Sequence, residues 1–67
     1  MRPTAGQVLK MFDNNVARTA QAAGISRQAV NKWKTNPSRL LDAEVVINLE
    51  RNTSGLIEFD KEDFFLN

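Results

Sequence analysis

The sequence contains no cysteine and no histidine. Disulfide bonds, thiol nucleophiles and zinc sites built from these two residue types are therefore excluded, and the commonest general base is missing. The chain also has no tyrosine, one tryptophan, two prolines and three glycines among its 67 residues. Because a chain of this length encloses one small core, we expect a single domain over residues 1–67.

Long apolar runs are absent as well. No stretch approaches the roughly 18–20 apolar residues that span a membrane, and the start, MRPTAGQVLKMF, lacks the long apolar region and cleavage pattern of a signal peptide. We therefore expect a cytoplasmic protein without a membrane partner. No glycine loop for phosphates, nucleophile–base pair or metal-ligand set is present either. We expect no enzyme, no cofactor, no metal and no small-molecule ligand.

The charges that are present are divided along the chain. Residues 1–39 hold seven basic residues and one acidic residue, whereas residues 40–67 hold two basic and seven acidic residues. The net charge is only +1, but a basic first half suits a polyanion, and the acidic second half should face away from it. The alternative is that solvated charges are segregated without a function.

The N-terminal third carries the signals of a helix start. Thr4 and Gln7 have the spacing of a capping box, in which each side chain bonds a free backbone amide. A first helix is predicted from Ala5 to about Phe12, with its apolar side directed into the core. The apolar residues of that side are Val8, Leu9 and Phe12.

Two further short helices are predicted between Asn15 and Pro37. Asn15 is a suitable N-cap for a helix over about Val16–Ala23, and Gly24 can end that helix because glycine tolerates a positive φ. Ser26 then caps a third helix, which ends before Pro37 because the residue preceding a proline disfavours the α conformation.

This third helix has two unlike sides. Counting about 100° per residue, Val30 and Trp33 fall on one side, and the opposite arc carries two cations and two amides but no acid. These are Arg27, Gln28, Asn31 and Lys32. Cations and amides are the groups that bond guanine and adenine edges in the major groove, so this arc predicts contacts to bases. The alternatives are a plain solvated face, and Trp33 as a platform for base stacking rather than a core residue.

Other polar residues of the basic half are candidates for phosphate contacts. They are Asn15 with the amide end of the second helix, Arg18, Lys34 and Arg39. Such contacts would hold the DNA backbone and set the register of the protein on the duplex. For Lys34 and Arg39 the alternative is ordinary surface charge.

The last third of the chain permits two structures. The β-branched run Val45–Ile47 favours a strand, and a hairpin at about residues 44–60 would give an α+β fold. The competing structure is a helix capped by Asp42 over Ala43 to about Asn52, followed by a short helix, Lys61–Phe65, capped by Asp60. In the helical version Ile47 points away from the core, which counts against it.

Residues 15–33 resemble the helix-turn-helix of the lambdoid phage Cro and repressor families. The matching framework residues are Ala20, Gly24, Ile25, Val30 and Trp33. The tail, LERNTSGLIEFDKEDFF, is similar to all-helical Cro-like and YdaS-like antitoxin-type regulators, in which a Leu-Glu pair precedes a Thr-x-Gly helix end. That likeness favours an all-α, lambda-repressor-like fold of five short helices, although other Cro proteins end in a hairpin. The loop after Trp33 and the link at 13–15 are longer than in the all-helical pattern.

The resemblance implies a sequence-specific DNA-binding transcriptional regulator, a Cro-like repressor of a phage or prophage in a bacterial cell. The family reads bases with residues early in the second helix of the motif (16–35), which here are Ser26, Arg27, Gln28, Asn31 and Lys32. One such helix reads few base pairs, so we expect a weak homodimer on a pseudo-palindromic operator in double-stranded DNA.

The C-terminal segment, residues 42–67, is the expected core and dimerisation element. Its acidic, Phe-rich end is a candidate for pairing subunits, and the alternative is that these side chains cover the core of the monomer. The residues concerned are Phe59, Phe64, Phe65 and Leu66. A function of another class also stays open, namely a protein-interaction module such as an antitoxin or anti-repressor that uses this tail.

Overall fold

The computed structural model describes residues 2–64 and is all-α over that range. Four α-helices and one 3-10 helix follow each other as α1 (Ala5–Met11), α2 (Val16–Ala23), α3 (Arg27–Thr35), α4 (Ala43–Asn52) and η1 (Lys61–Asp63). Within residues 2–64 the extended backbone forms only an isolated antiparallel bridge between Thr4 and Leu40. The predicted all-α class is confirmed.

The helix starts that the sequence predicts are confirmed. Thr4 and Gln7 form the reciprocal capping box of α1. The Oδ1 atom of Asn15 accepts the backbone N–H of Arg18 at 3.0 Å, and Ser26 Oγ accepts that of Ala29 at 3.1 Å. Each of these caps satisfies an amide that has no partner within its own helix.

The C-terminal third is helical, so the hairpin alternative at residues 44–60 is wrong. α4 covers Ala43–Asn52 and buries Val46 and Leu49, while Ile47 is exposed, as the helical pattern requires. Asp42 occupies the N-cap position, but its side chain makes no capping hydrogen bond. Its carboxylate lies instead 3.9 Å from a guanidinium nitrogen of Arg2. The expectation that Asp42 caps the helix with its side chain is therefore corrected.

The predicted last helix is shorter than expected. Asp60 caps it by accepting the N–H of Glu62, but the helix is one 3-10 turn, Lys61–Asp63. Phe59 and Phe64 flank this turn, and their rings stack with centroids 5.3 Å apart. Both are partly buried against the core. These two phenylalanines therefore cover the monomer, whereas the predicted pairing residues Phe65 and Leu66 lie outside the described residues.

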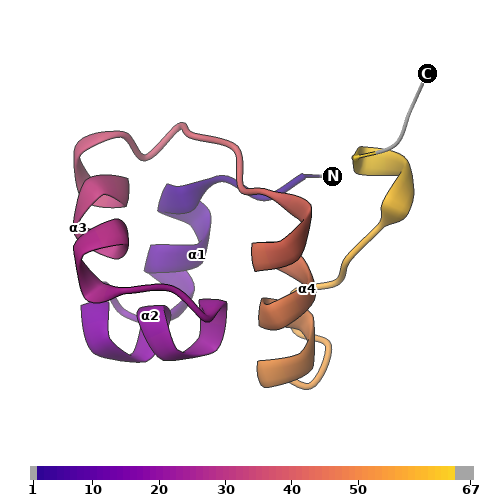
Figure 1. The fold of residues 1–67 in the computed structure, drawn as a ribbon, viewed down its shortest axis with the longest axis horizontal. Helices are drawn as coiled ribbons and strands as arrows, with labels where there is room; N and C mark the ends of the chain where they lie inside the picture. The colour runs from indigo at the N-terminus through magenta and orange to yellow at the C-terminus, as the bar shows by residue number, and fades with distance from the viewer. Residues whose placement is uncertain (1, 65–67) are drawn as a thin grey trace.

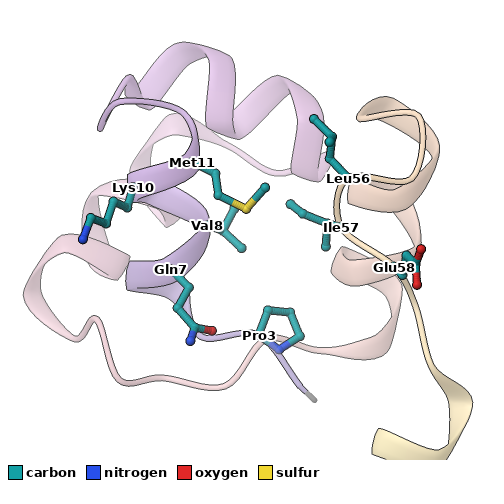
Figure 2. Close-up of a pocket in the computed structure, with 8 residues that line it drawn as sticks. All are labelled: Pro3, Gln7, Val8, Lys10, Met11, Leu56, Ile57 and Glu58. Carbon is teal, nitrogen blue, oxygen red and sulfur yellow. The ribbon is translucent and has the colours of Figure 1, made fainter.

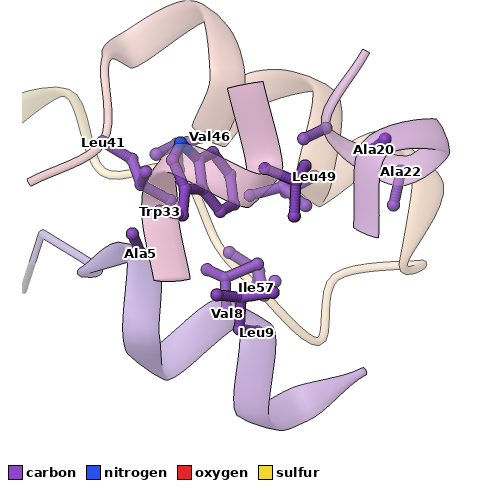
Figure 3. Close-up of a cluster of buried hydrophobic side chains, with 12 residues drawn as sticks. Ala5, Val8, Leu9, Ala20, Ala22, Trp33, Leu41, Val46, Leu49 and Ile57 are labelled. Atoms are coloured by element: carbon purple, nitrogen blue, oxygen red, sulfur yellow. The ribbon is translucent and has the colours of Figure 1, made fainter. Parts of the chain in front are cut away.

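The helices enclose one core (Figure 1). α2 contacts both α3 and α4, and α1 packs on α2 and α3. In Figure 1 α3 stands at one end of the long axis, and α4 and then the C-terminal turn lie toward the other. The buried cluster draws side chains from all four α-helices, from Leu41 and from Ile57 (Figure 3).

The loop between α3 and α4 is tied to the N-terminus. The N–H groups of Ala5 and Gly6 donate to the carbonyls of Arg39 and Pro37, at 2.9 and 2.8 Å. Arg2 Nε donates to the carbonyl of Leu41 at 2.7 Å. The start of α1 therefore fixes the segment that leaves α3, although the two are more than thirty residues apart in the chain.

Candidate nucleic-acid interface

α3 is divided between the core and the surface. Val30 is 0% exposed and Trp33 is 3% exposed, and both belong to the central cluster. Figure 3 shows Trp33 within that cluster. Trp33 is therefore a core residue, as predicted, and the alternative of a base-stacking platform is excluded because its ring is not accessible. The two side chains fix the rotation of α3 about its own axis.

The other side of α3 is open. Arg27, Gln28, Asn31 and Lys32 are all exposed. Within residues 2–64 no hydrogen bond or ion pair engages any of these four side chains. They are therefore available to a ligand without the loss of an internal bond. Ser26 is also exposed, but its Oγ lone pair already caps α3, which leaves its O–H as the group free to donate.

One shallow hollow joins base-contact candidates to a phosphate-contact candidate. Gln28 and Lys32 of α3 line it together with Ser26 and with Arg39 of the following loop. Its volume is about 300 Å³. Arg39 is thus held beside the polar face of α3 by the bond from the Ala5 amide to the Arg39 carbonyl.

The remaining phosphate-contact candidates lie apart from this hollow. Lys34, on the last turn of α3, lines a separate depression with Lys10 of α1. Arg18 lines a third one on α2, and the Oδ1 atom of Asn15 is used for capping. All four candidates are exposed, but they do not form one cluster. Lys34 and Arg39 flank α3, whereas Asn15 and Arg18 lie at the start of α2.

Two residues near these sites are not among the predicted ones. The proximity of Lys10 to Lys34 could not be predicted, because the residues around Lys10 in the sequence do not indicate which residues it meets in the fold. Asp42 lines the same hollow as Arg39 and introduces an acid beside it. The nearby guanidinium of Arg2 offsets part of that negative charge.

The charges of the sequence are separated in space. From residue 14 to residue 41 the chain has no acidic residue, and this range contains α2, α3 and the following loop. Apart from Asp42, which lines the hollow beside Arg39, the acids of the second half lie in α4, in η1 and in the segments beside them, toward the other end of the long axis from α3 (Figure 1). A polyanion approaching α3 therefore meets the basic end of the molecule first.

None of the helices over residues 2–64 is long and apolar enough to cross a lipid bilayer. Comparison of the chain with family models, curated proteins and solved structures finds no match. The assignment of residues 16–35 as a helix-turn-helix thus stays a prediction, and a function for the chain rests on its own residues.

Proposed function

We propose that this chain is a sequence-specific DNA-binding regulator of transcription, with α2, the turn at residues 24–26 and α3 acting as a helix-turn-helix. The observation that carries the proposal is the open face of α3. It presents two cations and two amides without an internal partner, on a helix anchored from behind by Val30 and Trp33.

These side chain types match the chemistry of base edges. The B-DNA major groove is about 12 Å wide and admits an α-helix, where arginine or lysine bonds the O6 and N7 atoms of guanine. Asparagine or glutamine bonds N6 and N7 of adenine. Arg27, Gln28, Asn31 and Lys32 therefore would read bases, and Ser26 would donate its O–H near the groove or to a phosphate.

Phosphate contacts would come from residues around α3. Arg39 lies beside Gln28 and Lys32, and Lys34 lies on the last turn of the same helix. Asn15 and Arg18, at the start of α2, would add contacts there, Asn15 through its Nδ2 atom. Such contacts orient the protein on the duplex and make its affinity depend on salt.

Repression would follow from occupancy of a promoter. One α3 reads only a few base pairs, so useful specificity requires two copies on half-sites about one helical turn apart. A Cro-like repressor of a phage or prophage, without ligand or cofactor, is the form of regulator that fits these features.

Selection from a random duplex library at about physiological salt tests the proposal. We expect enrichment of an approximately palindromic consensus, which would also supply the operator for the measurements below. A library that stays random would contradict the proposal. A protein partner would then have to be sought, as for an antitoxin or anti-repressor.

A further inference from the structure

A second surface lies on the side of α1 that faces the segment following α4. It is a groove of about 550 Å³ between α1 and the segment that follows α4 (Figure 2). One wall is formed by Val8, Lys10 and Met11, and the other by Leu56, Ile57 and Glu58. We refer to it as the α1 groove.

The centre of the α1 groove is apolar and exposed. Leu56 is 79% exposed and Met11 is 51% exposed, the two largest values among the large apolar residues of the described chain. Figure 2 shows Met11 directed from α1 toward Leu56 and Ile57. Leu56 therefore protrudes into solvent beside an apolar groove. Exposure of both surfaces to water is unfavourable, and burial against a partner would lower the free energy of each.

The two margins of the α1 groove carry opposite charges. Lys10 lies on the outer side of α1, and Glu58 lies on the far side of the opposite wall, with the apolar centre between them (Figure 2). Both are exposed, and within residues 2–64 neither has an ion-pair partner. Two copies of this surface that face each other can therefore bring opposite charges together.

We propose that the α1 groove is the surface on which a second copy of this chain docks. A two-fold axis that runs between the two walls carries α1 of one protomer over the 56–58 segment of its partner. Lys10 then faces the partner's Glu58, and Glu58 faces the partner's Lys10, because an isologous interface repeats each contact twice. Leu56 enters the partner's groove against Met11.

The size of the groove sets the expected strength of the association. The eight residues that line it are fewer than the roughly 20–30 per side of a standard interface. The association is therefore a monomer–dimer equilibrium and not a permanent dimer. The inference that this dimer reads two half-sites rests on the proposed function. The association itself is measured without DNA.

Sedimentation equilibrium over a wide concentration range is the first test. The wild type should dimerise with rising concentration, and Leu56→Lys should raise the dimer dissociation constant by at least roughly tenfold, since each substitution acts at two symmetric contacts. Leu40→Lys is the matched control, because Leu40 is 50% exposed outside the groove. Its dissociation constant should equal that of the wild type. A chain that stays monomeric, or a loss of association that is equal in both variants, overturns the proposal.

A charge exchange gives the second test. Lys10→Glu alone and Glu58→Lys alone should each dimerise more weakly than the wild type, because each places like charges together at both margins. An equimolar mixture of the two variants should form heterodimers more tightly than either forms homodimers, since both pairs are then opposite in charge. Unchanged helical circular dichroism shows that the variants are folded. No preference for the mixed pair overturns the proposed docking surface, but it does not bear on the proposed reading of bases by α3, because the association is measured without DNA.

Discussion

Gly24 lies directly against the side chain of Asn48. Gly24 ends α2 in the left-handed conformation, with φ at 70°, and a Cβ added there would lie 2.7 Å from Asn48 Nδ2. That same Nδ2 atom donates to the carbonyl of Ala23 at 3.2 Å. Because the last carbonyls of a helix have no partner within it, this contact joins the end of α2 to α4 at the turn that orients α3.

We expect Gly24→Ala to destabilise the fold by about 1–3 kcal/mol, because a side chain is strained at positive φ and the Cβ displaces Asn48. Thermal unfolding followed by circular dichroism measures the loss. Gly55→Ala is the control, since Gly55 also has a positive φ of 88° but nothing lies within 4 Å of its added Cβ. It should cost less than Gly24→Ala. Equal losses would show that the contact with Asn48 carries no energy.

Trp33→Ala should cost about 3–5 kcal/mol, because it empties the space of a large aromatic side chain in a small core. This loss is comparable to the whole stability of a domain of this size, so the variant should be largely unfolded at room temperature. Urea unfolding followed by circular dichroism measures it. A cooperative transition displaced by less than about 1 kcal/mol would contradict the placement of Trp33 in the core.

Arg2→Lys should weaken the fold almost as much as Arg2→Ala, although lysine keeps the charge. The guanidinium of Arg2 lies 4.7 Å from the centroid of the Phe64 ring while its Nε donates to the Leu41 carbonyl. A planar, forked group makes both contacts at once, and an ammonium does not. We expect each variant to lose about 1–2 kcal/mol in denaturant unfolding. Full retention of stability in Arg2→Lys would mean that charge alone matters.

The sequence predicts local features well and long-range ones poorly. Helix caps at Thr4, Asn15 and Ser26 are set by side chains a few residues from the amides that they bond, so they can be read from spacing. The run Val45–Ile47 suits a buried strand and a helix alike. Tertiary packing decides between the two structures in favour of the helix, which buries Val46 and leaves Ile47 exposed.

Contacts between distant segments had no signal in the sequence. Asn48 and Asn52 of α4 donate to the carbonyls of Ala23 and Ala22, and neither asparagine was predicted to matter. The same holds for Arg2. The polar face of α3 could be predicted from the helical period, but the proximity of Arg39 to it depends on how the N-terminus ties down a loop.

Lys34→Ala should weaken binding to all duplexes alike and lower the slope of log affinity against log salt by about one unit. Removal of one phosphate contact releases one counterion fewer on binding. Titrations at several salt concentrations, on the selected operator and on a scrambled duplex, measure both quantities. Lys61→Ala, in the turn at the far end of the chain, should leave the slope unchanged. A sequence-dependent loss in Lys34→Ala would assign that lysine to the bases.

The most direct test of base reading by α3 compares Gln28→Ala with Gln21→Ala on two duplexes. Both glutamines are exposed, but Gln21 lies on α2 outside the polar face of α3. Gln28→Ala should lose about 1–3 kcal/mol of binding free energy on the selected operator and almost none on a scrambled duplex, with a relaxed preference at the base pair it contacts. Gln21→Ala should bind both duplexes as the wild type does. An equal loss on operator and scrambled duplex in Gln28→Ala, or no loss on either, would contradict the account of α3 as the helix that reads the sequence.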